Sequence, residues 1–170
     1  MIKKFCFFVS VLFCWFISAG LQTVNKESNV KAAFVYNFTA YIDWDGYQNG
    51  NEFIIGVIGD SPITESLSQI ANSKKVNGKK ISIRKFKSPD EINHCHILFI
   101  SSDAAFPLNE ILGKAAVKGT LIISEKQGFA SQGSAINFVV VNNNLKFEVN
   151  TKSITSSGLK ASSQLLKLAI

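Results

Sequence analysis

The stretch Phe53–Pro62, FIIGVIGDSP, decides the fold class of this chain of 170 residues. From Phe53 to Ile58 every residue is apolar or glycine, which is typical of a strand that is buried on both faces. The following Gly-Asp-Ser-Pro ends such a strand and favours the start of a helix at Pro62. A strand followed directly by a helix is the repeating unit of a sheet with parallel crossovers.

Working outward from this stretch, short apolar runs alternate with helix-sized segments. We predict strands at Phe53–Ile58, Lys80–Phe86, His96–Ile100 and Thr120–Ser124. We predict helices at Pro62–Ala71, Pro89–Asn93 (a single turn) and Phe106–Lys118. An earlier helix is expected at Val30–Trp44, where apolar side chains recur at helical spacing.

The last third of the chain departs from this alternation. Ala135–Val141 and Leu145–Val149 are rich in β-branched and aromatic residues and are joined by three asparagines, which favours an antiparallel hairpin. A helix is expected at Ser153–Leu168, with Leu159, Leu165, Leu166 and Leu168 as core contacts. The whole predicts a single-domain α/β three-layer sandwich, whose mixed sheet has about six strands, mostly parallel with a C-terminal antiparallel hairpin, flanked by helices.

Composition and charge exclude several classes of protein. The chain is 46% hydrophobic and has only 11 glycines and 3 prolines, which excludes a disordered or collagen-like chain. The formal net charge is +6, and residues 74–87 carry seven basic side chains without an acidic one. That stretch has one aromatic residue and no recognition-helix pattern, so we interpret it as a solvated edge strand and turn, and we expect no nucleic-acid partner.

Residues 1–20 have the layout of a secretory signal peptide. Lys3 and Lys4 precede an uncharged apolar run, and Ser18, Ala19 and Gly20 suit a peptidase that admits small residues. We expect cleavage after Gly20, which leaves residues 21–170 as the folded domain; an uncleaved membrane anchor is the alternative. No hydrophobic run of spanning length follows Leu21, so we expect the exported part to be soluble.

Polar residues follow several of the predicted strands at their carboxyl ends, where open α/β sheets bind ligands. A small-ligand pocket is therefore one interpretation of these positions, and ordinary turn chemistry is the other. The candidate ligand-binding residues are Asp60, Ser61, Ser101, Ser102 and Glu125.

The first predicted helix is unusually aromatic. Packing in the core explains most of these side chains. A helix with this many aromatic residues is also able to present some of them on its surface, where they bind a partner protein. The candidate partner-binding residues are Phe38, Tyr41 and Trp44.

Catalytic and metal-binding patterns are weak in this sequence. His94 and His96 flank Cys95 at a strand entrance that we expect to be buried, and in an extended strand the two histidines face away from the cysteine. Cys95 is the only cysteine after residue 20, so it is either buried and inert or paired between chains. We expect no catalytic residues, no metal and no cofactor.

Several collinear strings together resemble the YfiR family of exported bacterial proteins. They are VKAAFVYNFTAYIDW at 30–44, FIIGVIGDSP at 53–62, VNGKKISIRKFKSPDEINHCHILFIS at 76–101, GFASQGSAINFVV at 128–140, LKFEVN at 145–150 and SGLKASSQLLKLA at 157–169. The resemblance implies a dimeric periplasmic repressor that binds the periplasmic domain of an inner-membrane diguanylate cyclase and is itself sequestered by an outer-membrane partner. Relatives with paired cysteines differ from this chain, in which Cys95 has no partner after residue 20.

Two functions follow from these observations. The first is a periplasmic regulatory binding protein that restrains a membrane-bound signalling enzyme, either a diguanylate cyclase or a sensor kinase, by protein contact. The alternative is a periplasmic protein that binds a small molecule at the carboxyl ends of the strands. Neither requires enzyme activity.

Overall fold

The computed structural model describes residues 26–44, 50–115 and 118–170. The expected signal peptide, residues 1–20, lies outside the described residues. Within the described part of the chain, none of the helices combines the length and apolar character needed to cross a bilayer.

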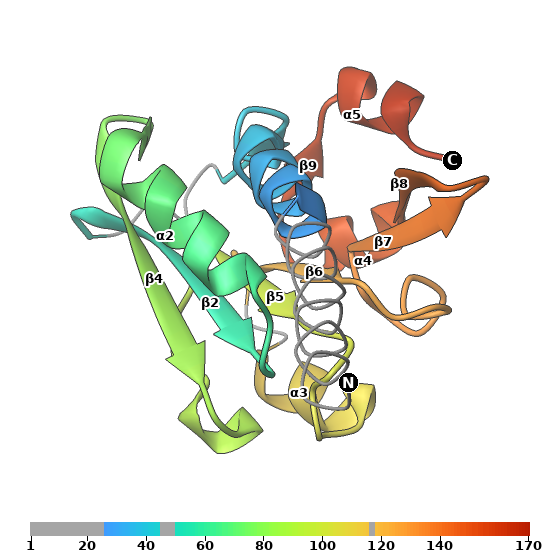
Figure 1. The fold of residues 1–170 in the computed structure, drawn as a ribbon, viewed down its shortest axis with the longest axis horizontal. Helices are drawn as coiled ribbons and strands as arrows, with labels where there is room; N and C mark the ends of the chain where they lie inside the picture. Colours follow the sequence, from blue (N-terminus) through green and yellow to red (C-terminus); the bar gives the residue numbers. More distant parts are fainter. Residues whose placement is uncertain (1–25, 45–49, 116–117) are drawn as a thin grey trace, which may run out of the picture.

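A seven-stranded sheet forms the centre of the molecule, in the order β3-β4-β2-β5-β6-β7-β8 (Figure 1). The strands β4, β2, β5, β6 and β7 are parallel to one another, while β3 and β8 are antiparallel to their neighbours. Their bounds are β2 Glu52–Ile58, β3 Lys75–Val76, β4 Lys79–Phe86, β5 Ile97–Ile100, β6 Leu121–Ser124, β7 Ile136–Val141 and β8 Asn144–Val149. The predicted strands are confirmed, and the short β3 adds one at the edge.

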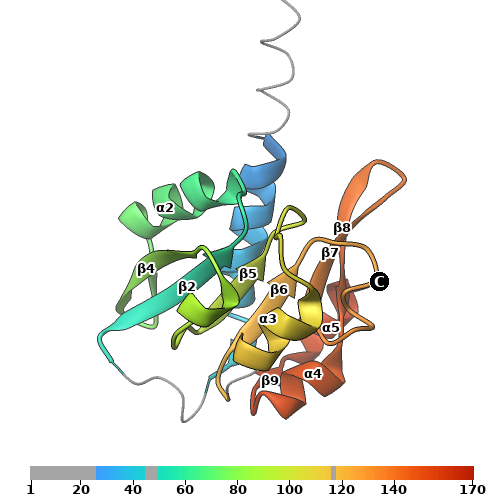
Figure 2. The same cartoon turned by 90° about the horizontal axis from the view of Figure 1, so that it is seen from below.

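Helices cover both faces of this sheet, as expected for a three-layer sandwich (Figure 2). One core cluster joins the N-terminal helix (residues 26–38), α2 (Ile63–Ser73), α4 (Thr151–Ser156) and α5 (Ser163–Leu168) to one face. A second cluster joins α3 (Leu108–Ala115) to the other face. The short 3-10 turn η1, Pro89–Glu91, precedes β5.

Strand β2 shows why an uninterrupted apolar run belongs in the centre of the sheet. Phe53, Ile55 and Val57 point into the first core cluster, whereas Ile54 and Ile58 point into the second. Successive side chains of a strand face opposite sides, so a strand covered on both sides has no position for a polar residue. Gly56 is the one residue of this apolar run without a side chain. A larger residue does not fit there, because a Cβ would lie 2.6 Å from the Phe86 ring.

The asparagine turn between β7 and β8 has the geometry predicted from the sequence. Asn142 and Asn143 have φ values of 49° and 60°, so both occupy the left-handed region that two-residue hairpin turns require. Pairing runs from Val141↔Asn144 to Ile136↔Val149. The hairpin extends the sheet beyond β6 and makes β8 its edge strand, where Ile170 N donates a hydrogen bond to Phe147 O at 3.1 Å.

The first helix ends earlier than the predicted Val30–Trp44, and its described part begins at Lys26. Helical structure ends at Phe38, and residues 39–41 form a turn. The chain then pairs as β1 (Ile42–Asp43) with β9 (Lys160–Ala161) in a separate two-stranded sheet. The prediction of helix for residues 39–44 was wrong because this long-range pairing outweighs the local helical spacing of the apolar residues.

The expected C-terminal helix, Ser153–Leu168, is in fact two short helices, α4 and α5, separated by β9. Gly158 has a φ of 75°, a left-handed conformation that ends α4. Leu159 and Leu165 are buried as predicted, at 2% and 0% exposure. Leu166 and Leu168 are 41% and 59% exposed, so placing them in the core was wrong; the break after α4 turns their side chains outward.

Candidate functional site

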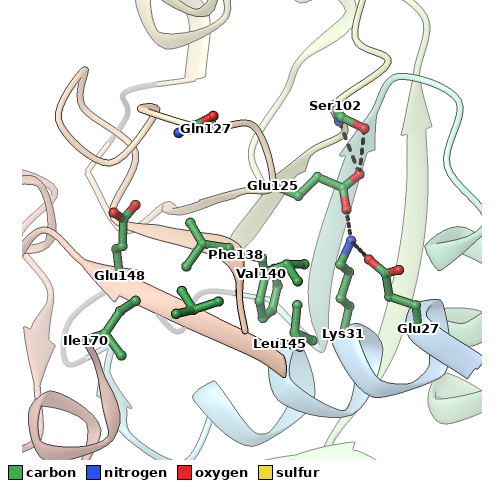
Figure 3. Close-up of a pocket in the computed structure, with 12 residues that line it drawn as sticks. Glu27, Lys31, Ser102, Glu125, Gln127, Phe138, Val140, Leu145, Glu148 and Ile170 are labelled. Carbon is green, nitrogen blue, oxygen red and sulfur yellow. Dashed lines mark hydrogen bonds and ion pairs between the residues drawn. The ribbon is translucent and has the colours of Figure 1, made fainter. Parts of the chain in front are cut away.

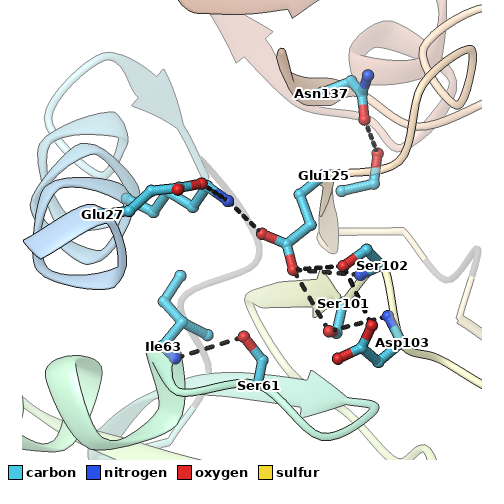
Figure 4. Close-up of polar contacts among 10 residues, drawn as sticks. Glu27, Ser61, Ile63, Ser101, Ser102, Asp103, Glu125 and Asn137 are labelled. Carbon is cyan, nitrogen blue, oxygen red and sulfur yellow. Dashed lines mark hydrogen bonds and ion pairs between the residues drawn. The ribbon is translucent and has the colours of Figure 1, made fainter. Parts of the chain in front are cut away.

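The carboxyl ends of β5 and β6 lie side by side and hold a largely buried carboxylate. Glu125 follows β6, and only 9% of its side chain is exposed. Its Oε1 accepts hydrogen bonds from Ser102 N at 3.1 Å, from Ser101 Oγ at 3.3 Å and from Ser102 Oγ at 3.5 Å (Figure 4). Three of the five candidate ligand-binding residues are therefore in direct contact.

The other oxygen of Glu125 faces the N-terminal helix. Lys31 Nζ donates to Glu125 Oε2 at 2.7 Å and also lies 2.6 Å from Glu27 Oε1, one helical turn earlier. Burial by itself lowers the pKa of the Lys31 ammonium, but its hydrogen bonds and charge interactions with Glu125 and Glu27 outweigh burial and raise that pKa above its ordinary value. The ammonium is thus held in its charged form, and the ion pair ties the helix to the sheet.

The two remaining candidate residues do not join this cluster. The side chain of Asp60 is 98% exposed, with Oδ1 lying 3.5 Å from Lys85 Nζ. Ser61 Oγ accepts a hydrogen bond of 3.4 Å from Ile63 N at the start of α2, which is ordinary turn chemistry. The expected pocket therefore does not run across all five residues.

Close packing at Gly59 explains this separation. Gly59 has a φ of 94°, and a Cβ there would lie 2.9 Å from Ser101 Cβ and 3.0 Å from Ala104 N. The loop after β2 consequently rests directly on the loop after β5. A cavity of about 410 Å³ remains at this edge and includes Asp60 and Asp103, but none of Ser61, Ser101, Ser102 or Glu125 lines it.

A cavity of about 570 Å³ lies instead on the other side of Glu125, between the N-terminal helix and the β7–β8 hairpin (Figure 3). Such a volume falls in the range of small-molecule sites. One wall is apolar and comes from the hairpin and the last residue, while the opposite wall is charged. The lining includes Phe138, Val140, Leu145 and Ile170 on the apolar side and Glu27, Lys31 and Glu125 on the charged side, while Glu148 of β8 lies near Ile170 (Figure 3).

Sequence reasoning missed Lys31, Glu148 and the hairpin as parts of this site. Lys31 and Glu125 are separated by 94 positions, and no local pattern links them. Glu148 is held by a buried network behind the cavity, in which Asn137 Nδ2 donates to Glu148 Oε2 at 3.1 Å and Ser124 Oγ lies 2.7 Å from Asn137 Oδ1. A signal for Glu148 does exist, because it is the one acidic residue of its strand, β8.

The three candidate partner-binding aromatics occupy different environments. Phe38 and Trp44 are each only 2% exposed and belong to the first core cluster. Trp44 Nε1 lies 3.1 Å from Gly119 O and 3.3 Å from His96 O, which anchors the segment after the first helix. Tyr41 is half-buried. Of the three candidates, therefore, Tyr41 alone has an exposed part that a partner can contact. The role of Tyr41 in partner binding stays a prediction.

The residues around Cys95 do not form a reactive group. Cys95 is 1% exposed, which confirms the buried interpretation, and burial raises the pKa of its thiol to about 12. His96 is buried as expected, but His94 is exposed, so placing both histidines in a buried entrance was wrong for His94. Within residues 26–44, 50–115 and 118–170, no three His, Cys, Asp or Glu side chains are grouped to hold a metal ion.

Comparison with known proteins identifies the family of this chain. No curated protein matches the chain. The family model described as DUF4154, YfiR/HmsC-like, matches residues 28–170, which include every described strand and helix from α2 onward and most of the N-terminal helix. The chain therefore belongs to the YfiR/HmsC-like family.

Proposed function

We propose that this protein restrains a membrane-bound diguanylate cyclase by binding the periplasmic domain of that enzyme. The observation that carries the proposal is the family match over residues 28–170, because YfiR/HmsC-like proteins are periplasmic regulators of diguanylate cyclase signalling. The family is regulatory rather than catalytic, so the proposed mechanism is occupation of a surface and includes no chemical step.

An exposed apolar face supports a mechanism of this kind. Val140 and Ile170 are 63% and 61% exposed, and Val30 and Val141 are each 40% exposed. Val140 lines both the cavity described above and a second one, of about 600 Å³, that also includes Val30. We call this surface of Val30, Val140, Val141 and Ile170 the hairpin face. Exposed apolar groups rimmed by charged ones are typical of protein interaction sites.

A matched pair of variants tests this assignment. Val140→Lys places a charge on the hairpin face, whereas Asn109→Lys places the same charge on an exposed position of α3, on the opposite side of the sheet. If the hairpin face binds the cyclase, Val140→Lys releases the restraint and raises cellular cyclic-di-GMP, and Asn109→Lys leaves it unchanged. Equal behaviour of the two variants would remove the hairpin face from the proposal.

The cavity beside Glu125 favours a second candidate function, the binding of a small molecule. Its volume of about 570 Å³ and its combination of an apolar and a charged wall are features of ligand sites. A ligand at 100 times its dissociation constant stabilises a protein by about 2.7 kcal/mol, which a thermal-shift screen detects. A screen without any such shift would argue against this second function.

Two further partners follow from the resemblance to the YfiR family and belong to the same proposal. One is a second copy of this chain in a homodimer, and the other is an outer-membrane protein that sequesters the repressor. Sedimentation of the purified exported protein tests the first, because a monomer at micromolar concentration would contradict it. Overexpression of the outer-membrane partner tests the second. If that partner sequesters the repressor, the diguanylate cyclase is released and cellular cyclic-di-GMP rises.

A further inference from the structure

Four lysines surround the short hairpin formed by β3 and β4. Lys74 ends α2, Lys75 lies in β3, and Lys79 and Lys80 begin β4. The turn between the strands is tight, with Asn77 and Gly78 at φ values of 50° and 79°. Lys74, Lys75 and Lys80 are exposed. We call this group the lysine hairpin.

The register of the two strands places like charges opposite each other. Lys75 pairs directly with Lys80 across the antiparallel ladder. Residues in such positions have Cβ atoms about 5 Å apart, and like charges there are destabilising. The protein thus carries a local repulsion that a nearby anion would relieve.

Two nearby acids, Glu52 and Asp60, pair with other basic side chains of the described chain. Farther along β4, Arg84 lies 3.9 Å from Glu52 and Lys85 lies 3.5 Å from Asp60. Among the residues that the structure describes, no ion pair includes Lys74, Lys75 or Lys80. Glu52 is the strand neighbour of Lys80, but the positive charge of Arg84 balances it. Among the described residues, Lys74, Lys75 and Lys80 therefore present positive charge to the outside without an ion-pair partner.

Protection of a sheet edge against aggregation explains only part of this arrangement. Lysines spaced along an exposed edge serve that purpose, and Lys85 is placed in this way on β4. Protection of an edge does not require that Lys75 and Lys80 lie directly opposite each other in the hairpin. An external anionic partner gives a reason for this placement.

The surroundings of the lysine hairpin favour a lipid surface over a protein. Protein interfaces need an apolar or aromatic centre. The exposed large apolar side chains of the described chain are all elsewhere, in the N-terminal helix, β7, α5 and the last residue: Val30, Val140, Val141, Leu166, Leu168 and Ile170. A layer of anionic headgroups needs no such centre, because flexible lysines meet it through charge alone.

The strand order also suits attachment to a membrane. Strands β3 and β8 are the two edges of the seven-stranded sheet, and Figure 1 places β4 and the β7–β8 hairpin on opposite sides of the molecule. Six strand spacings separate β3 from β8, which at about 4.8 Å each is roughly 29 Å. A bilayer that contacts the lysine hairpin therefore leaves the hairpin face and the cavity accessible.

We propose that the lysine hairpin is a docking surface for anionic phospholipid headgroups, which concentrates the protein at a membrane. The attraction is electrostatic and weakens as the ionic strength rises. This proposal does not depend on the identity of the signalling enzyme, because it concerns lipid binding by the isolated protein.

Co-sedimentation of the exported protein with lipid vesicles tests the proposal. We expect binding to vesicles of phosphatidylglycerol and phosphatidylcholine at 50 mM salt, and no binding to vesicles of phosphatidylcholine alone. Each lysine near an anionic bilayer contributes about fivefold to partitioning, so Lys74→Gln/Lys75→Gln/Lys80→Gln is expected to weaken binding by about 100-fold. The same variant is expected to keep the wild-type unfolding midpoint or exceed it, because it removes a repulsion.

A second triple variant controls for net charge. Lys118, Lys152 and Lys167 are exposed and lie outside the lysine hairpin, so changing all three to Gln removes the same charge elsewhere. We expect this control to lose less than about fivefold in partitioning. Equal losses in the two triple variants would overturn the proposal. It would also be overturned if the wild type bound an acidic polymer such as polyglutamate but not the anionic vesicles.

Discussion

Lys31 and Glu125 form an ion pair between the first helix and the end of β6, with Nζ and Oε2 2.7 Å apart. Their side chains are only 14% and 9% exposed, and the carboxylate is also held by Ser101 and Ser102. Removal of Lys31 from this ion pair is costly, because the Glu125 carboxylate then stays largely buried without its counterion. The ion pair thus links the N-terminal helix, which lines the cavity, to the end of strand β6.

Lys31→Met should lower the free energy of unfolding by about 3 kcal/mol, since it leaves Glu125 as an unpaired buried carboxylate. Urea unfolding at pH 7 measures this change. Lys152→Met, on the exposed start of α4, is the control and should change stability by less than about 0.5 kcal/mol. If the double variant Lys31→Met/Glu125→Gln is no more stable than Lys31→Met alone, the destabilisation does not come from the unpaired charge.

Gly59→Ala should be among the most damaging small substitutions in this chain. The φ of 94° is strained for any residue with a Cβ, and the added carbon would lie 2.9 Å from Ser101 Cβ. We expect a loss of about 2 kcal/mol or more in unfolding free energy, measured by urea denaturation. Gly78→Ala is the matched control: its φ of 79° carries the backbone strain, but no atom lies within 4 Å of the added carbon. Equal losses would show that crowding against Ser101 plays no part.

His96 should make the stability depend on pH below neutrality. Its Nδ1 accepts a hydrogen bond of 3.0 Å from Ile54 N, and burial together with the charges of His94 and Lys79 lowers its pKa from 6.5 to about 4. The unfolded chain therefore binds a proton more readily than the folded one, so this contribution is complete above pH 6.5 and is lost as the pH falls toward 4. We expect a loss of about 3 kcal/mol across this range, since one pKa unit corresponds to about 1.4 kcal/mol.

A comparison of variants isolates the part due to His96. His96→Asn keeps a hydrogen-bond acceptor for Ile54 N but removes the titrating ring, so its unfolding free energy should fall less steeply between pH 6.5 and 4.5. His94→Asn removes one of the two charges that act on His96 but leaves its burial, the larger cause, so this variant should retain most of the slope of the wild type. Identical slopes for His96→Asn and the wild type would refute the assignment.

Cys95 should be unreactive while the protein is folded. Burial raises the pKa of its thiol to about 12, so the nucleophilic thiolate is scarce at neutral pH. Alkylation with iodoacetamide, followed by mass spectrometry of the peptide that contains Cys95, should find this residue unlabelled in buffer and fully labelled in 6 M urea. Rapid labelling of the native protein, or a disulfide-linked dimer through Cys95, would contradict its burial.

The strands of this protein could be predicted because their signal is local. A strand covered on both faces must be apolar throughout, and Phe53–Ile58 shows this in its sequence without reference to any other segment. The turn at Asn142 and Asn143 was predictable for a similar reason, since few residues adopt a positive φ readily.

The errors occurred where distant contacts decide the structure. Tyr41, Ile42 and Trp44 continue the apolar spacing of the first helix, yet Ile42 pairs with Ala161, and Ser162 N donates to Tyr41 O at 2.8 Å. No local signal indicates this pairing. In the last helix, Gly158 was an available signal for a break, and its left-handed conformation separates α4 from α5.

The site was predicted in part for the same reasons. Neighbouring parallel strands end at the same edge of a sheet, so the contact of Ser101 and Ser102 with Glu125 could be expected from the order of the elements. The ion pair with Lys31 depends on how the first helix lies across the sheet, and the hairpin wall depends on the placement of β7 beside β6. Both are properties of the assembled fold.

Cellular cyclic-di-GMP in a strain that lacks this protein tests the proposed restraint of a diguanylate cyclase most directly. We predict that deletion raises the cyclic-di-GMP level several-fold, that the intact chain restores it, and that a copy without residues 1–20 does not. An unchanged level after deletion, or full restoration by the copy that lacks residues 1–20, would contradict a role as an exported repressor of such an enzyme.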